Sequence, residues 1–147
     1  MSTTLSLCHF VFNTHCRKMT INEQHENALY RFIWKLLESK RCKLLRIGGI
    51  PNHIHLLVDI HPNISKALLA GEIKRASSLW MKQSGLFPEF EGWGNEYFGF
   101  SKSLNDKNMI INYIKNQKIH HRQFTFEQEI ESITVEEGMT WNEEMLT

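Results

Sequence analysis

The segment 51–60, PNHIHLLVDI, constrains the fold of this 147-residue chain more than any other stretch. In a β-strand alternate side chains point to opposite faces of the sheet, so the segment divides into two faces, with Leu57 on the face of the histidines. One face would carry apolar side chains ready for burial, namely Ile54, Leu56, Val58 and Ile60. The other face would place His53 and His55 side by side, with Asp59 further along. Two imidazoles on a rigid strand are either half of a metal site or a pair of buried hydrogen-bonding groups, and other segments must decide between these.

The order of the expected elements extends this strand to a whole domain. Four segments have the β-branched and aromatic composition of strands between Gly, Pro and Asn turn signals. They are 6–12, 40–50, 51–60 and 96–104. Three segments have apolar residues at helical spacing behind a residue that can cap a helix. They run from 20 or 22 to about 39, from 65 to about 83, and from 105 or 106 to about 122. The β-α-β-β-α-β order predicts an α+β, ferredoxin-like antiparallel sheet with an additional C-terminal helix.

Charge divides the chain into a basic body and an acidic tail. Residues 1–126 contain all 17 Lys and Arg but only nine acidic residues, whereas residues 127–147 contain seven Glu and no Lys or Arg. We expect 1–126 to form a single domain and 127–147 to pack on or near it. The expected packing residues of the tail are Ile130, Ile133, Trp141 and Leu146. A basic body favours a polyanionic partner, but a solvated basic surface balanced by the tail explains the charge equally well.

Composition restricts the class of protein further. The chain is 41% hydrophobic and 22% charged, as ordinary globular domains are. Its apolar runs are far shorter than the roughly 20 residues of a membrane-spanning helix, and we expect no signal peptide and no membrane partner. Cys8, Cys16 and Cys42 are odd in number and lack the CxxC spacing of zinc and redox motifs. We therefore expect reduced thiols and a cytoplasmic protein.

The segment 108–122, NMIINYIKNQKIHHR, supplies a second group of polar side chains. On a helix, Ile110, Ile111 and Ile114 form one stripe that can pack on the sheet. A separate face carries polar groups at positions i, i+3, i+4 and i+7, which are Tyr113, Asn116, Gln117 and His120. Tyr113 and Gln117 are one turn apart, so both side chains can reach the same small target.

Together the two segments resemble the single-tyrosine HUH transposases, which include the single-strand insertion-sequence transposases and the REP-associated tyrosine transposases. The resemblance joins GGIPNHIHLLV to Y-I-x-N-Q-x-x-H-H on the later helix. It continues through HFVFNTHCRK, LYRFI, RCKLLRIGGI, SKALLAGEIKRASSLW, WGNEYFGFSKS and HHRQFTF. It implies a metal-dependent transposase that recognises hairpins in single-stranded DNA and rejoins strands through a 5′-phosphotyrosine intermediate. It also implies a homodimer, often with the tyrosine helix of one subunit completing the site of the other.

The resemblance assigns a role to each candidate residue. His53 and His55 would be the metal ligands of the HUH motif, Gln117 the third ligand, and Tyr113 the nucleophile. The ion would be Mg²⁺ or Mn²⁺, and Mn²⁺ accepts imidazole ligands more readily. Asp59 shares the histidine face but ranks below Gln117 as a ligand. Tyr97 is the rival nucleophile, but it has no Gln four residues later.

The basic body suggests where DNA would bind. Phosphate contacts position a nucleic acid without reading its sequence, and we expect them from basic side chains on the helix at 65–83 and around it. The candidates are Lys66, Lys74, Arg75, Arg46 and His120. His120 and His121 would otherwise be solvated side chains at a helix end. A non-catalytic or domesticated nucleic-acid-binding domain of ferredoxin-like fold also explains the basic body. It does not explain why Tyr113 and Gln117 accompany the two histidines.

Overall fold

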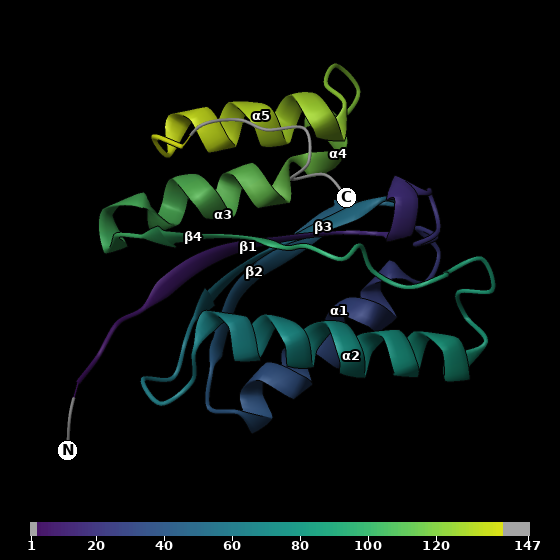
Figure 1. Ribbon diagram of the computed structural model, residues 1–147, viewed down its shortest axis with the longest axis horizontal. Coiled ribbons are helices and arrows are strands. Elements are labelled where there is room, and N and C mark those ends of the chain that lie inside the picture. The colour runs from purple at the N-terminus through teal and green to yellow at the C-terminus, as the bar shows by residue number, and fades with distance from the viewer. Residues whose placement is uncertain (1–2, 140–147) are drawn as a thin grey trace.

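The computed structural model describes residues 3–139 and places a four-stranded sheet between two layers of helices (Figure 1). The strands are β1 (Leu7–Asn13), β2 (Lys43–Ile50), β3 (His53–Asp59) and β4 (Phe98–Lys102). Their order in the sheet is β2-β3-β1-β4, and every neighbouring pair is antiparallel. The predicted ferredoxin-like α+β fold is therefore confirmed.

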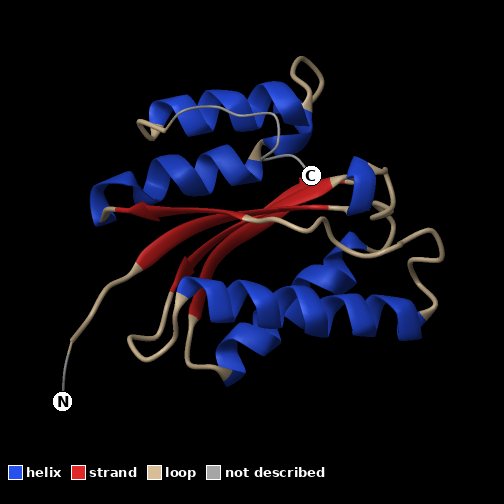
Figure 2. Ribbon diagram, in the orientation of Figure 1, coloured by secondary structure: helices blue, strands red, loops and turns tan. Residues whose placement is uncertain are grey.

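The helices divide between the two faces of the sheet, as Figure 2 also shows. One face is covered by α1 (Glu26–Ser39) and α2 (Lys66–Ser84). The other is covered by α3 (Lys107–Lys115), α4 (Gln117–His120) and α5 (Phe126–Glu136). Two short 3₁₀ helices lie in connections, η1 (His15–Arg17) and η2 (Leu104–Asp106). Among residues 3–139, no helix has the length and apolar character needed to cross a bilayer.

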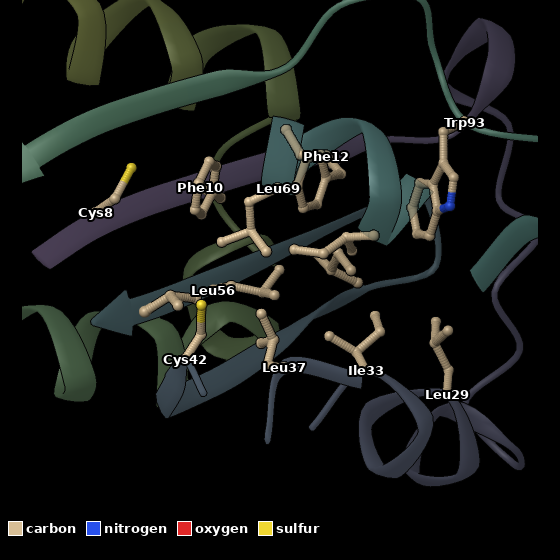
Figure 3. Packing of buried hydrophobic residues seen from close by; sticks show 14 of the residues in the cluster. Cys8, Phe10, Phe12, Leu29, Ile33, Leu37, Cys42, Leu56, Leu69 and Trp93 are labelled. Atoms are coloured by element: carbon tan, nitrogen blue, oxygen red, sulfur yellow. The ribbon is translucent and has the colours of Figure 1, made fainter. Parts of the chain in front are cut away.

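The face under α1 and α2 holds the main hydrophobic core. Ile54, Leu56 and Val58, which the alternation of β3 assigned to one face, are completely buried there. Figure 3 shows side chains of α1 pointing toward Leu56 of β3 and Leu69 of α2. The buried α1 residues of this core are Leu29, Ile33 and Leu37. Burying each such side chain stabilises the fold by about 1.5–3 kcal/mol.

The opposite face, which carries the histidines, is also largely buried. Leu57 of β3 packs with Ile110 and Ile114 of α3. A second cluster joins α5 to the sheet through Val11, Phe98, Phe100, Phe126 and Ile130, with Ile133 partly buried beside them. Trp141 and Leu146, the other expected packing residues of the tail, lie outside the described residues. Polar side chains on this face must find their hydrogen-bond partners within the protein.

A glycine in β2 sets how closely α3 approaches the sheet. Gly48 pairs with His55 of β3. A Cβ atom at this position would lie 2.9 Å from the backbone oxygen of Ile114, closer than real Cβ contacts. Only glycine therefore lets α3 come this near, and the approach brings the ring of Tyr113 to within 5.6 Å of the His55 ring, measured between centroids.

Two features of the C-terminal third differ from the sequence prediction. The helix expected to run unbroken to about residue 122 is divided at Asn116, whose φ of −97° and ψ of 17° are not helical. Its N–H still donates to the carbonyl of Asn112 at 3.1 Å, but its backbone angles interrupt the helix, so that α3 ends at Lys115 and α4 begins at Gln117. The helix α5 was not predicted at all. It begins with a capping box in which Thr125 and Gln128 bond each other's backbone N–H groups.

Candidate active site

Strand β3 positions the two histidines of the HIH motif. His53 and His55 are 0% exposed and share the sheet face covered by α3, α4 and α5. Their ring centroids lie 5.0 Å apart. The i, i+2 spacing on an extended backbone produces this arrangement, because both side chains leave the strand on the same side.

Helices α3 and α4 bring the remaining predicted residues to the same place. The Gln117 Oε1 atom lies 3.1 Å from His53 Nε2, and the Gln117 side chain is buried. The Tyr113 hydroxyl points into the same cluster. His120 lies beside it, with its ring centroid 5.5 Å from that of Tyr113. The structure therefore gathers His53, His55, Tyr113, Gln117 and His120 from β3, α3 and α4.

A residue that sequence reasoning missed occupies the centre of this cluster. Glu129 of α5 is 2% exposed, and its Oε1 atom lies 3.0 Å from His53 Nε2 and 3.1 Å from His55 Nε2. The same oxygen lies 3.0 Å from Nε2 of His121. Three imidazole nitrogens thus converge on one carboxylate oxygen, and two of them come from the predicted histidine pair.

The second oxygen of Glu129 faces the tyrosine. It accepts hydrogen bonds from the Tyr113 hydroxyl and, at 2.7 Å, from Nε2 of Gln117. His120 Nε2 lies 3.6 Å away, too far for a hydrogen bond, and this buried nitrogen has no hydrogen-bond partner among residues 3–139. Glu129 therefore links the nucleophile predicted from the sequence to the predicted metal ligands.

The sequence indicates only weakly that Glu129 and His121 belong to the site. Glu129 follows the Thr125–Gln128 capping pattern, with Phe126 and Ile130 at helical spacing beside it. That pattern predicts a helix, but it does not tell which way a glutamate on the helix points. His121 was expected to be a solvated side chain, whereas its side chain is almost fully buried. The tail was expected to pack on the domain through its apolar residues, and none of its glutamates was assigned to the site.

A second layer of groups holds the imidazole rings in place. Nδ1 of His55 lies 2.8 Å from Nε2 of His9, a buried residue of β1 that sequence reasoning also missed. Nδ1 of His53 lies 2.8 Å from Oδ1 of Asn52. Because these contacts use Nδ1 of His53 and His55, the other ring nitrogen, Nε2, is directed toward Glu129 in both residues. Such outer partners fix the orientation of metal-ligating histidines in proteins.

The burial of this cluster shifts the pKa values of its members. Loss of water lowers the pKa of His53 to about 4, because the neighbouring Glu129 carboxylate, which favours the protonated ring, compensates only in part. Burial alone would raise the pKa of Glu129, but His55, His121 and His53 outweigh it, and the pKa lies below the ordinary value. Burial and the neighbouring Glu129 charge raise the pKa of Tyr113. At neutral pH, His53 is therefore neutral, Glu129 ionised and Tyr113 protonated.

The donor set fits a divalent cation. His53, His55 and Glu129 form a buried group whose ligand atoms lie within 4.8 Å of one another, and His120, His121 and Glu129 form a second, partly buried group of the same spacing. Around an ion with bonds of about 2.1 Å, ligands at right angles lie about 3.0 Å apart. The separations from Glu129 Oε1 to the nearest nitrogens of His53 and His55 match this spacing.

The structure does not bring the predicted DNA-binding lysines and arginines to this site. Lys66, Lys74 and Arg75 lie on α2, on the opposite face of the sheet from Tyr113. Lys74 donates to the carbonyl of Gly94 at 2.6 Å, which fastens the loop before β4, and burial lowers its pKa. Arg75 is exposed, and so is Arg46 on the edge strand β2. Their contacts with DNA remain predictions.

The fold and the site together define the class of HUH-type tyrosine transposases. The protein family described as "Transposase IS200 like" matches residues 2–117. The chain therefore belongs to the IS200-like transposase family, and the family predicted from its motifs is confirmed. The match ends at Gln117, so His121, Glu129 and the whole of α5 lie beyond it.

Individual relatives agree with this membership. The chain is 28% identical over 113 residues to the transposases for insertion sequence element IS200 from Salmonella typhimurium strain LT2 and Salmonella typhi, covering 74% of either chain. A putative transposase from Deinococcus radiodurans R1 has a similar solved structure, with a TM-score of 0.63 and 20% identity over 80% of this chain and 95% of that one. The structure of a REP-associated tyrosine transposase bound to a REP hairpin is also similar, with a TM-score of 0.61 and 15% identity. That similarity covers 82% of this chain and 73% of the other chain. The two structures support the fold.

Proposed function

We propose that this transposase cleaves and rejoins single-stranded DNA in a metal-dependent reaction through a 5′-phosphotyrosine intermediate, with Tyr113 as the nucleophile. The observation that carries the proposal is the convergence of Tyr113, His53, His55 and Gln117, which come from three elements, around the carboxylate of Glu129. A ferredoxin-like domain that only binds nucleic acid has no need for a half-buried tyrosine beside two buried histidines.

His53, His55 and Gln117 would hold the divalent ion, Mg²⁺ or Mn²⁺. When bound, the ion would polarise the scissile phosphate and stabilise the negative charge that develops on the leaving 3′-oxygen. Asn52 and His9 keep the two imidazole rings turned toward the site. Because these contacts hold the rings in place, the ligands are already oriented before DNA binds.

Tyr113 attacks the phosphorus atom of the DNA backbone. A bond forms between the phenolic oxygen and phosphorus while the bond from phosphorus to the 3′-oxygen breaks, which leaves a free 3′-hydroxyl. The phenol is a weak nucleophile until it loses its proton, and its raised pKa makes that loss harder. Glu129 Oε2 already accepts the hydroxyl hydrogen bond, so it is the nearest group that can take the proton. Attack by another 3′-hydroxyl reverses the sequence and frees Tyr113.

The substrate we propose is a hairpin in single-stranded DNA. The REP-associated transposase that shares this fold was solved bound to a REP hairpin, which supports the assignment. Basic side chains would hold the phosphates, with Lys66, Arg75, Arg46 and His120 as the candidates alongside Lys74. We also propose a homodimer, which sedimentation of the DNA-free protein would test.

A covalent-adduct experiment tests the chemistry. Hairpin oligonucleotides from the DNA flanking the gene, labelled at the 3′ end or the 5′ end, are incubated with the protein and Mn²⁺ and analysed on denaturing gels. A 5′-phosphotyrosine link keeps the 3′-labelled fragment on the protein and releases the 5′-labelled one. We expect a covalent band that requires Mn²⁺, disappears in Tyr113→Phe and persists in Tyr97→Phe, the matched control. Hairpins that bind without forming any adduct would instead support a non-catalytic binding domain.

A further inference from the structure

The position of the ring hydrogen on His121 follows from its neighbours. Its Nδ1 atom lies 2.7 Å from the backbone oxygen of Phe124, and a carbonyl oxygen can only accept a hydrogen bond. The hydrogen of a neutral His121 ring therefore lies on Nδ1, and Nε2 carries a lone pair. That lone pair faces Glu129 Oε1 at 3.0 Å, and an ionised carboxylate is also only an acceptor. Two acceptors thus face each other with no hydrogen between them.

His53 repeats this arrangement. Its Nδ1 lies 2.8 Å from the side-chain oxygen of Asn52, so the ring hydrogen is again used on the outer side. Its Nε2 faces Glu129 Oε1 at 3.0 Å and Gln117 Oε1 at 3.1 Å. The amide nitrogen of Gln117 donates to the other carboxylate oxygen, which leaves the amide oxygen on the side of His53.

His55 allows the same state. Its Nδ1 lies 2.8 Å from His9 Nε2, and when His55 donates in this pair its own Nε2 presents a lone pair to Glu129 Oε1 at 3.1 Å. Several acceptor atoms then surround one small volume. A buried group of acceptors without hydrogens is costly unless something positive lies between them, and the outer hydrogen bonds are those typical of metal-ligating histidines.

We propose that Glu129 and His121 are metal ligands in the DNA-free protein and that, with His53 and His55, they form a site of three imidazoles and one carboxylate. The inference rests on the proposed function, because it concerns the same ion. The family match ends before both residues, so neither assignment follows from membership of the family. Three nitrogen ligands favour Mn²⁺ over Mg²⁺, which prefers oxygen.

The proposed site ties the C-terminal helix to the sheet. Glu129 belongs to α5, and His121 lies in the turn that follows α4. An ion bridging these residues to β3 is bound more tightly when α5 is docked, and α5 is docked more firmly when the ion is present. Ion binding and the position of α5 are therefore linked.

Metal affinity, measured without DNA, tests the proposal. Mn²⁺ is titrated by calorimetry into the full-length protein and into Glu129→Gln and His121→Gln. The matched controls are Glu131→Gln, an exposed glutamate of the same helix, and His15→Gln, an exposed histidine. We expect Kd for Mn²⁺ to weaken at least about tenfold in Glu129→Gln and His121→Gln and to stay unchanged in the controls. Mn²⁺ should also raise the Tm of the wild type more than that of Glu129→Gln, and circular dichroism of the metal-free proteins verifies folding.

If Glu129 is not a ligand, the change in Kd for Mn²⁺ that Glu129→Gln causes should have the opposite sign or be absent. If Glu129 only fills the place of the ion, paired with protonated imidazoles, Glu129→Gln removes a competitor and Kd for Mn²⁺ tightens or stays constant. That result overturns the proposal, and so does an unchanged affinity in His121→Gln. Should Glu129→Gln fail to fold, His121→Gln decides the question. The adduct experiment with Tyr113→Phe is independent of these titrations, so the proposed function can stand when the four-ligand site fails.

Discussion

The two faces of strand β3 are equally buried but are stabilised in different ways. On β3, Leu56 and His55 are neighbours in the chain, and both are 0% exposed. Leu56 points into a core of aliphatic and aromatic side chains from α1 and α2. His55 points into a cluster where its two ring nitrogens contact His9 and Glu129. Burial by itself therefore does not indicate apolar surroundings.

The difference between the faces is one of directionality. Hydrophobic burial depends on the area removed from water and tolerates changes of partner, so the α1 and α2 face needs only shape and volume. A buried polar cluster needs every donor and acceptor in place, because an unpaired buried group costs about 1–3 kcal/mol. The polar face has these partners only because α5 supplies Glu129.

Substituting the two neighbours should separate catalysis from stability. His55→Ala should lower the rate of adduct formation by at least about a thousandfold, because the stabilisation that a bound ion supplies is worth several kcal/mol. Leu56→Ala should instead lower the free energy of unfolding by about 2–5 kcal/mol through the cavity it leaves. The rate of adduct formation and urea denaturation, both measured on each variant, provide the check. A Leu56→Ala protein that unfolds as the wild type does would contradict this account of the core.

Lowering the pH should reduce the free energy of unfolding through the buried groups of the polar face. The contribution of the apolar face should not depend on pH. His53 in the folded protein takes up its second proton only near pH 4, whereas the unfolded ring does so near 6.5. Between these values the unfolded state binds more protons, so the free energy of unfolding falls as the pH is lowered from about 6.5 to about 4. One such group contributes roughly 3 kcal/mol. The lowered pKa values of His9 and Glu129 act in the same direction.

Urea denaturation in EDTA, repeated between pH 7.5 and 4, measures this slope. Leu56→Ala should be less stable by a constant amount at every pH, because Leu56 does not titrate. His15→Gln should follow the wild type, since His15 is exposed. A flat wild-type profile would show that the buried histidines do not govern stability.

The smallest effect of a substitution is expected for Arg75, the exposed arginine of α2, and it concerns the affinity for hairpin DNA. Arg75→Ala should weaken hairpin binding only a few-fold, because a phosphate contact positions DNA without reading its sequence. It should also reduce the slope of log affinity against log salt concentration by about 1. Fluorescence anisotropy at several salt concentrations measures both, with Tyr113→Phe as a control that keeps its phosphate contacts. An unchanged slope would mean that the DNA runs only along the face that carries Tyr113.

Much of the apolar half of the molecule could be predicted from the sequence. The alternation in 51–60 assigned Ile54, Leu56 and Val58 to one buried face, and all three are there. Ser65 was expected to cap the second long helix, and its side chain accepts a hydrogen bond from the Leu68 N–H. Side-chain direction on strands and helices repeats every 2 and 3.6 residues, so short segments contain this information.

Part of the candidate site could also be predicted, because the regular direction of side chains along strands and helices applies to residues that are close in sequence. The pairs His53 and His55, and Tyr113 and Gln117, are close in sequence, so local geometry places each pair on one face. His9 and Glu129 meet His55 across 46 and 74 residues. Lys74, expected to be free for DNA, is held by the carbonyl of Gly94 in a loop that sequence periodicity does not describe.

The sequence by itself determined the strands, most of the helix faces and the local residue pairs, because backbone geometry repeats over a few residues. Only the tertiary structure decided that α5 folds over the histidines and inserts Glu129 among them. A glutamate on an amphipathic helix has the same local pattern whether it faces water or a buried site. The choice depends on which distant groups can replace its hydration, and here hydrogen bonds from Tyr113 and Gln117 to the carboxylate offset part of the cost of its burial.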